Sequence, residues 1–240
     1  MANLTATVLD PLLRADPMGP RITYYDDATG ERIELSTVTL ANWAAKTANL
    51  LRDELGAGPG SRVAVLLPAH WQTAAVLLGV WWIGAEVVLP PAEAGSADIV
   101  FCTAERLDEA GEAAGTGEIA VLSLDPFGKP VADLPLGVTD YATAVRVHGD
   151  QVLPERSPGD ALAGRSAEAL LAEAGASADA AGLTASDRVW SAGRWETPDL
   201  LISNLLAVFA AGASLVQVAN PDPAVQDRHR TTEKVTRAFS

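Results

Sequence analysis

The chain has 240 residues, 48% of them hydrophobic, which is enough for a substantial core in one large domain or two smaller ones. Its formal net charge of −14, with only 17 scattered Lys and Arg residues, argues against binding to nucleic acid or to an anionic membrane. Because there is neither a basic N-terminal region followed by an apolar stretch nor a run of about 18 apolar residues, we expect a cytoplasmic protein without membrane insertion.

The first part of the chain predicts a hairpin followed by a helix. Residues 22–25 and 33–35 are β-prone runs on either side of the turn-rich segment 26–30. Thr39 is a plausible N-cap, and apolar residues from Leu40 to Leu55 recur at the spacing of one buried helix face.

Two strand–helix–strand repeats come next. The continuous apolar run 63–67 is typical of a parallel strand that is covered on both faces. It is followed by a nearly all-apolar helix over 70–83 and a strand over 86–89. The pattern then repeats as a strand over 99–102, a helix over 104–114 and a strand over 119–122. Cys102, the only cysteine, excludes an intramolecular disulfide and is expected to be a buried strand thiol.

The second half contains more loop. Pro, Gly and Asp predict a surface loop over 125–140, and residues 148–160 are expected to form a mobile surface loop without phosphate-cradling geometry. The remaining predicted elements are a strand over 141–147, a helix over 165–174, a strand over 188–191, a helix over 197–211 and a strand over 214–218.

These elements predict an α/β protein whose lobes are three-layered, with mostly parallel sheets flanked by helices. We expect a first lobe with the N-terminal hairpin over 1–140, a partial second lobe over 141–219 and a polar tail over 220–240. Since the chain begins with Met1 and ends in this polar tail, we expect 240 residues to be its natural length.

Three segments in this order resemble the N-terminal domain of the adenylate-forming superfamily, which includes the acyl-CoA synthetases. The first is 51–68, with its Gly-Pro-Gly turn before an apolar strand, and the second is 82–90, with the phrase Gly-Ala-Glu-Val-Val-Leu-Pro. The third runs from Leu-Thr-Ala-Ser-Asp-Arg-Val at 183–189 to the strand at 214–218. A helix that family members usually carry after the second segment is expected to be missing between Pro91 and Asp98.

The resemblance implies a Ser/Thr/Gly-rich loop, ending in Pro-Lys between the two lobes, that wraps the phosphates of ATP. The matching positions in this chain form a degenerate version of that loop: His148, Gly149, Asp150, Gln151, Pro154 and Glu155. Asp150 and Glu155 would repel a triphosphate by about 4 kcal/mol for each close charge pair. The family's other catalytic parts lie beyond residue 240, so we assign no catalytic residue and no cofactor.

One segment remains a candidate ligand groove. It follows the predicted strand at 188–191, at the end of a parallel strand where ligands commonly bind. Its residues are Trp190, Ser191, Gly193, Arg194 and Trp195. The alternative is a structural remnant of the family's acyl pocket. We expect no metal site, because His70, His148 and His229 lie in unrelated segments without Glu or Cys at ligand spacing.

The leading hypothesis is a non-catalytic relative of acyl-CoA synthetases with a binding, regulatory or scaffold role. The alternative is a component of an AMP-forming ligase that binds an acyl or nucleotide ligand and is completed by a partner chain. We expect a homodimer, or a complex with another protein, through the helix at 197–211 and a free edge of the strand at 214–218. Alternatively, residues 220–240 fold back over that edge and cover it with Val225, Val235 and Phe239.

Overall fold

The computed structural model describes residues 2–92 and 95–239, which contain two five-stranded sheets. The first sheet is parallel throughout and has the order β4-β3-β5-β6-β7. Its strands are β3 (Arg62–Leu66), β4 (Glu86–Val88), β5 (Ile99–Cys102), β6 (Glu118–Val121) and β7 (Val138–Asp140). The predicted strands at 63–67, 86–89, 99–102 and 119–122 are therefore confirmed.

The second sheet has the order β10-β8-β9-β1-β2, and only β2 is antiparallel to its neighbour. Its strands are β1 (Pro20–Asp26), β2 (Glu31–Ser36), β8 (Arg188–Ser191), β9 (Ser214–Ala219) and β10 (Arg237–Phe239). The predicted hairpin forms, but β1 pairs with β9. It therefore lies with the second sheet, although the sequence analysis placed it with the strands of the first lobe.

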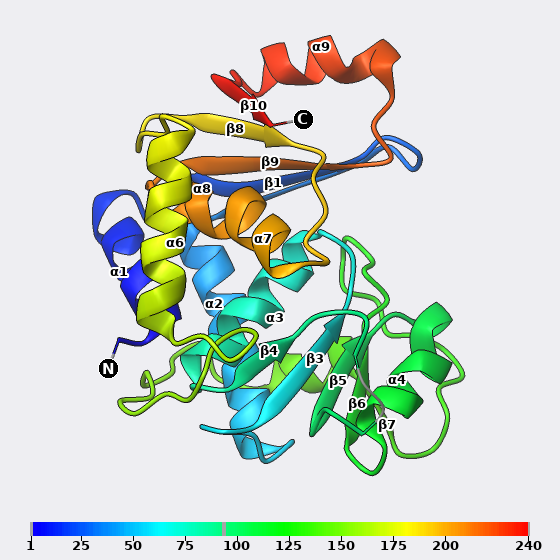
Figure 1. Ribbon diagram of the computed structural model, residues 1–240. Coiled ribbons are helices and arrows are strands. Elements are labelled where there is room, and N and C mark those ends of the chain that lie inside the picture. The colour runs from blue at the N-terminus through cyan, green and yellow to red at the C-terminus, as the bar shows by residue number, and fades with distance from the viewer. Residues whose placement is uncertain (1, 93–94, 240) are drawn as a thin grey trace.

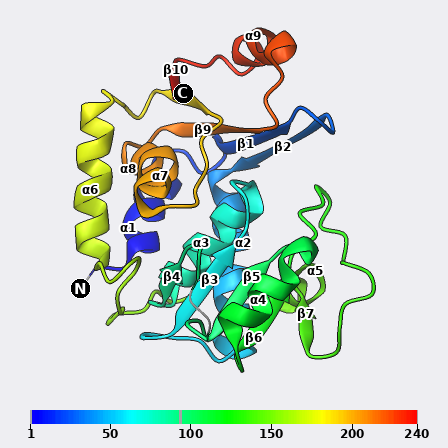
Figure 2. The same cartoon turned by 45° about the vertical axis from the view of Figure 1, so that its right-hand side comes forward.

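The helices form layers around and between these sheets (Figures 1 and 2). Helices α2 (Thr37–Asp53) and α3 (Trp71–Trp82) lie between the sheets, α4 (Leu107–Ala114) covers the outer face of the first sheet, and α9 (Pro223–Thr232) covers the outer face of the second. The others are α1 (Leu4–Ala15), α5 (Tyr141–Ala144), α6 (Ala167–Ala180) and a continuous helix made of α7 (Pro198–Leu201), a π-helical segment (Ile202–Leu206) and α8 (Ala207–Ala210). Short 3₁₀ turns at Ala104–Arg106 and Val145–Val147 adjoin α4 and α5.

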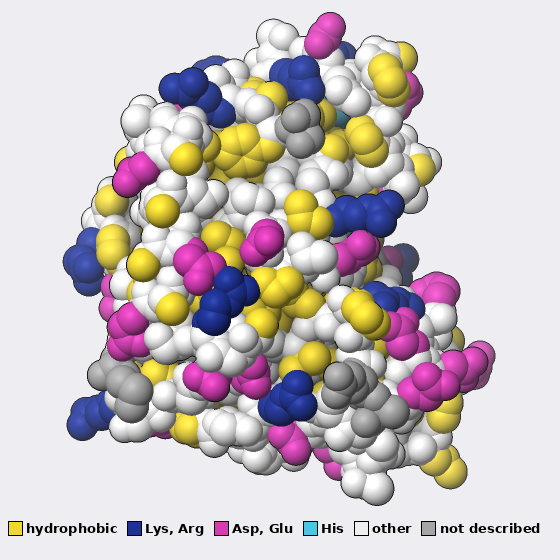
Figure 3. All heavy atoms as spheres, in the orientation of Figure 1, with side chains coloured by type: hydrophobic (Ala, Val, Ile, Leu, Met, Phe, Trp, Pro, Cys, Tyr) yellow, Lys and Arg dark blue, Asp and Glu magenta, His cyan; other side chains and the backbone are white. Residues whose placement is uncertain are grey.

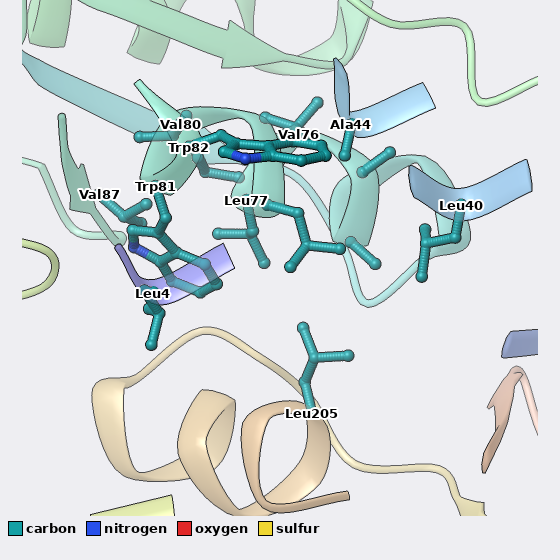
Figure 4. Packing of buried hydrophobic residues seen from close by; sticks show 14 of the residues in the cluster. Leu4, Leu40, Ala44, Val76, Leu77, Val80, Trp81, Trp82, Val87 and Leu205 are labelled. Atoms are coloured by element: carbon teal, nitrogen blue, oxygen red, sulfur yellow. The ribbon is translucent and has the colours of Figure 1, made fainter. Parts of the chain in front are cut away.

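Helix α3 is the centre of the main core. Every residue from Trp71 to Trp82 is buried, because the helix has packing partners on all sides. Figure 4 shows Leu4 of α1, Leu40 of α2, Val87 of β4 and Leu205 of the π-helical segment around its side chains. This contiguous cluster joins the two sheets into one hydrophobic core.

The prediction of a strand over 141–147 is wrong, because this segment is α5 and a 3₁₀ turn. The carboxylate of Asp140 accepts a hydrogen bond from the backbone nitrogen of Thr143 at 2.8 Å and so caps a helix. The strand lies just before it, as β7, inside the predicted loop 125–140.

Two helix starts also differ from the predictions. Helix α1 was not predicted; it begins after Asn3, whose side chain accepts from the backbone nitrogen of Ala6. Helix α2 is capped by Ser36 and not by Thr39, because the hydroxyl of Ser36 accepts from the backbone nitrogen of Thr39 at 3.2 Å.

Strand β9, which was expected to have a free edge, is paired on both sides. Strand β9 pairs with β8 on one side and β1 on the other, and β10 then covers the other side of β8. Part of the tail thus folds back as α9 and β10, with Val235 packed against Trp190 and its neighbours and Phe239 packed against the main core. The tail therefore folds back as the alternative expected, but it covers β8 and not β9, and Val225 is not among the residues packed in these clusters. Self-association stays a prediction that this edge no longer supports.

Residues 148–160 form neither helix nor strand, as expected of a surface loop. The expected loss of a helix between Pro91 and Asp98 falls partly on residues 93 and 94, which lie outside the described residues; the rest of that segment is not helical. In the described ranges, no helix combines the length and apolar composition needed to cross a membrane. Basic side chains are dispersed over the face seen in Figure 3.

The close approach of α2 and α3 generates a testable prediction. A Cβ atom at Gly79 would lie 2.9 Å from Cβ and Cγ2 of Thr47 and 3.0 Å from the carbonyl oxygen of Ala44. Gly79→Ala should therefore push the helices apart and lower the free energy of unfolding in urea by about 1–3 kcal/mol. Gly111→Ala in α4 meets nothing within 4 Å and serves as the control, with a gain of up to about 1 kcal/mol. A Gly79→Ala protein as stable as wild type would contradict this packing.

Candidate functional site

The positions compared with the phosphate loop lie along α2 on the first lobe. They are His148, Gly149, Asp150, Gln151, Pro154 and Glu155. The carbonyl of His148 accepts a hydrogen bond from Nζ of Lys46 at 2.6 Å, and Nδ2 of Asn49 donates to the carbonyl of Gly149 at 2.8 Å. This part of the loop is therefore held through its carbonyl groups, which cannot bind phosphate oxygens.

The end of the same loop is held by α3. The backbone nitrogen of Glu155 donates to the carbonyl of Trp82 at 3.0 Å, and the carboxylate of Glu155 accepts from the backbone nitrogen of Ser157 at 2.8 Å. A phosphate cradle needs several unpaired N–H groups that converge on one point. At Glu155 the N–H group instead satisfies a carbonyl at the end of a buried helix.

The chain crosses from the first sheet to the second lobe at a different place. Leu162 makes a parallel bridge to Val87 of β4 and an antiparallel bridge to Arg165. The backbone nitrogen of Ala161 donates to the carbonyl of Arg165 at 2.7 Å, and that of Arg165 donates to the carbonyl of Leu162 at 3.0 Å. The sequence analysis missed this crossing, for which Gly164 and the cap residue Ser166 before an Ala-rich helix were the available signal.

Two hydrogen-bond donors of the turn formed by Ala163, Gly164 and Arg165 are bonded to side chains of the protein itself. The backbone nitrogen of Gly164 donates to Oε1 of Glu86 at 2.8 Å, and Nη1 of Arg165 lies 2.6 Å from Oε2 of Glu173. Ser166 then caps α6. The strand–turn–helix order is that of a phosphate loop, but the turn is closed on itself.

The candidate groove residues divide between the two faces and the end of strand β8. They are Trp190, Ser191, Gly193, Arg194 and Trp195. Trp190 is buried on the outer face, where Cζ of Arg230 lies 5.1 Å from its ring centroid and Tyr25 packs in the same apolar cluster. Arg194 is exposed and forms a 3.4 Å ion pair with Glu196. Trp190 and Arg194 therefore do not share a cavity.

Ser191 and Gly193 belong to a hydrogen-bonded unit on the inner face, beside the buried Trp195, whose indole nitrogen has no hydrogen-bond partner among the described residues. The hydroxyl of Ser191 donates to Oδ1 of Asn204 and accepts from the backbone nitrogen of Gly193, both at 3.0 Å. Nε2 of Gln217 donates to the carbonyl of Gly193 at 3.0 Å. Trp195 is only 3% exposed and packs in the main core. Ligands commonly bind at the carboxyl end of a parallel strand, which is where these residues lie, but here side chains of the protein fill that space.

A cleft of about 320 Å³ lies between these two regions, beside the edge strand β4. Its walls come from β4 and the residues after it, from Leu162 and Ala163, and from Glu196, Thr197 and Pro198. The charged side chains on its wall are paired, Arg62 with Glu86 at 3.5 Å and Glu196 with Arg194 at 3.4 Å. The cleft joins both candidate regions, and its mixed apolar and polar wall suits a small, weakly polar group.

The densest charge network holds the C-terminal segment. The carboxylate of Glu233, whose side chain is 4% exposed, is bonded to Arg188, to Nη2 of Arg32 at 2.8 Å and to the hydroxyl of Tyr25 at 2.6 Å. Burial alone would raise the pKa of Glu233, but these hydrogen bonds bring its pKa below the ordinary value. The network fixes α9 and β10 to the second sheet.

The histidines make carboxylate pairs and no metal site. The separations are 3.8 Å for His70 and Glu31, 3.1 Å for His148 and Glu54, and 3.4 Å for His229 and Asp27. In the described part of the chain, no group of three or more His, Cys, Asp or Glu residues could hold a metal ion. Cys102 is fully buried in β5, which confirms the predicted buried strand thiol, and burial raises its pKa to about 11.

Comparison with known proteins agrees with the resemblance seen in the sequence. Residues 15–106 match the family model described as "AMP-binding enzyme". The chain is 68% identical over 241 aligned positions to a protein of Mycobacterium tuberculosis named "TIGR03089 family protein", covering 99% of this chain and 98% of that protein.

Solved structures of similar fold are about twice as long. An acyl-CoA synthetase of Brucella canis matches 99% of this chain with a TM-score of 0.83 and 19% identity, and 47% of its own length is covered. A benzoate CoA ligase of Burkholderia xenovorans matches 96% of this chain with a TM-score of 0.72 and 17% identity, and 48% of its length is covered. At this identity the likeness concerns the fold, and the chain spans about half of each structure.

The Glu233 network generates a prediction about acid stability. A carboxyl whose pKa is lowered by folding stabilises the protein above its unfolded pKa, about 4.5, and this stabilisation is lost as the pH falls through the lowered value. Glu233→Gln should remove about 3 kcal/mol from the free energy of unfolding at pH 7, and progressively less as the pH falls through the lowered pKa of Glu233. Urea unfolding over a series of pH values from 7 downward measures this, with the exposed Glu118→Gln as control. Equal stability of the variant and wild type at pH 7 would show that the network does not hold the tail.

Proposed function

Because the chain belongs to the TIGR03089 family and is an AMP-binding-like relative of the acyl-CoA synthetases, we propose that it is a non-catalytic member of this group. Its role is to bind a small molecule or a protein, and it does not adenylate a carboxylate by itself. The proposal is based on the groups needed to bind ATP phosphates, because enzymes with acyl-CoA synthetase activity share this fold and the fold alone therefore does not decide the function.

The observation that carries the proposal is the closed turn at the crossing between lobes. Adenylation requires a loop that wraps a triphosphate with backbone N–H groups, hydroxyl groups and a Lys. Here Leu162 and Arg165 bond to each other across the turn, and the N–H group of Gly164 is taken by Glu86. No lysine stands in or beside this turn, and nothing in it is long enough to enclose a phosphate chain.

The loop over 148–160 supports the same conclusion through its charge. Asp150 is exposed, Glu155 is partly buried, and the carbonyl groups of His148 and Gly149 are bonded to α2. Each carboxylate within about 4 Å of a phosphate charge would cost roughly 4 kcal/mol at intermediate dielectric. Neither segment that could occupy the place of the phosphate loop thus offers a favourable field for ATP.

A cleft beside β4 could serve the proposed binding role. The cleft of about 320 Å³ beside β4 lies next to the closed turn and has walls from both lobes. Its mixture of apolar side chains and a neutralised Arg62–Glu86 pair suits an uncharged or weakly polar group better than a nucleotide triphosphate.

The test is carboxylate-dependent exchange of radiolabelled pyrophosphate into ATP, with acetate, benzoate and decanoate as substrates. We expect no exchange above a no-enzyme control, because the charge stabilisation that the reaction needs is missing. An active acyl-CoA synthetase in the same assay shows that exchange is detectable, and a mock purification from the same host identifies contamination. Carboxylate-dependent exchange that exceeds both controls would overturn the non-catalytic proposal.

A further inference from the structure

Two adjoining clefts open at the amino ends of β8 and β9. The first has a volume of about 570 Å³ and lies between α1, α6 and the end of α8, which sit side by side in Figure 1. The second has a volume of about 540 Å³ and is lined mostly by polar residues of the turns before β8, β9 and β10. They share Asp16, Arg21, Ala185 and Gly212, so together they form one space with an apolar and a polar half.

The apolar half has the composition of a ligand pocket. Its walls are Val8, Pro11 and Leu12 from α1, Leu171 and Gly175 from α6, and Phe209, Ala210 and Ala211 from the end of α8. Gly175 and the alanines leave room where larger side chains would close the gap between the helices. A cavity of this size and lining is in the range that binds small organic ligands.

Arg21 stands at the junction of the two halves and is only 5% exposed. Nε donates to the hydroxyl of Thr37 at 3.2 Å, and Nη1 donates to the carbonyls of Gly212 and Ala213 at 2.8 and 2.7 Å. Within the described residues, Nη2 makes no hydrogen bond and the guanidinium makes no ion pair. Three neutral acceptors thus hold a largely buried charge on which the carboxylate of Asp16 acts without forming an ion pair, whereas buried charges are normally paired directly.

The other charged groups of the polar half are accounted for. Arg188 is neutralised by Glu233, and Asp187 accepts hydrogen bonds from Thr184 and Thr236. Lys234 is exposed to water.

Asp16 lines both halves at the surface, and its Oδ1 accepts from the backbone nitrogen of Gly19 at 2.8 Å. Its negative charge weakens the attraction of Arg21 for anions and disfavours a multiply charged head group.

We propose that this space binds a monoanionic amphiphile, with its apolar chain between α1, α6 and α8 and its carboxylate on Nη2 of Arg21. The head group supplies the direct ion-pair partner that Arg21 lacks, and the apolar tail of the ligand fills the apolar half. The site lies at the amino end of β8, opposite the carboxyl end where Ser191 and Gly193 are found. It therefore does not depend on whether the protein adenylates, and a failed exchange assay leaves it open.

Isothermal titration calorimetry of the full chain, below micelle concentrations, tests the site with three probes. Decanoate has both the apolar tail and the carboxylate, decanol has the tail without the carboxylate, and acetate has the carboxylate without a long tail. We expect decanoate to bind at least about tenfold more tightly than decanol, which corresponds to about 1.4 kcal/mol, and acetate to show no measurable binding. Failure of decanoate to bind, or equal affinity for decanol, would overturn the proposal.

Two matched glycine variants test where the apolar tail of decanoate binds. A Cβ at Gly175 in α6 or at Gly111 in α4 meets nothing within 4 Å, so a side chain can start from either position without a clash at its first atom, and both substitutions gain helix propensity. Gly175→Leu places its side chain in the apolar half and should weaken decanoate at least about tenfold, whereas Gly111→Leu should not change it. Equal affinity of both variants for decanoate would place the ligand elsewhere and contradict the site.

Two charge variants locate the head group. Asp16→Asn keeps an acceptor for Gly19 but removes a negative charge beside the site, so decanoate should bind more tightly and decanol should not. Arg21→Gln should remove the preference for decanoate over decanol. If Arg21→Gln fails to fold, Asp16→Asn still decides the question, because an unchanged affinity for decanoate would show that the carboxylate is not at Arg21.

Discussion

Burial of α3 on all sides is the constraint on which the rest of this structure depends. A helix without a solvent face leaves the carbonyl groups of its last turn out of reach of water, and these groups must find partners in the protein. Thr5 donates to the carbonyl of Leu78 at 2.6 Å and Asn3 donates to that of Trp82 at 2.9 Å. Helix α1 is thereby fixed to α3, and α2 approaches the same helix closely at Gly79.

The same constraint removes freedom from the segments that a catalytic relative would need to move. The indole nitrogen of Trp81 donates to the carbonyl of Ala161 at 2.8 Å, directly before the turn at the lobe crossing. The N–H group of Glu155 is used by the carbonyl of Trp82. One backbone N–H group and one backbone carbonyl of these segments are thus used in burying α3. The hydrogen bonding of the segment 155–161 and the tight packing of the core are two aspects of one arrangement.

Two buried charged groups on the second sheet differ in how they are paired. On the outer face, Glu233 gathers Arg188, Arg32 and Tyr25 and so holds a helix, α9, that has no buried residue of its own. Near the amino ends of the strands, Arg21 is buried with neutral partners only. Arg188 and Arg32 have a direct ion-pair partner in the folded chain, while Arg21 has none. This difference separates a structural network from a candidate binding site.

The sequence by itself determined the elements whose signal is local. Apolar runs such as 63–67 and 99–102, and the apolar helix over 70–83, were predicted correctly because hydrophobic periodicity is set by neighbours along the chain. The likeness to AMP-binding enzymes could also be inferred from the order of three short sequence segments. Ser191 and Gly193 lie at the end of a strand, as predicted, but the sequence could not show that Asn204 and Gln217 fill the space beside them.

Only the tertiary structure decided which distant segments meet. The hairpin joins the second sheet because β1 pairs with β9, nearly the whole chain length away. Segment 141–147 is helical because Asp140 caps it, and the tail covers β8 because Glu233 finds Arg188. The burial of Arg21 is a property of α1, α8 and β1 together, and nothing near residue 21 in the sequence announces it. Pairing, capping and burial depend on partners that are remote in sequence, and their energies exist only once the chain has folded.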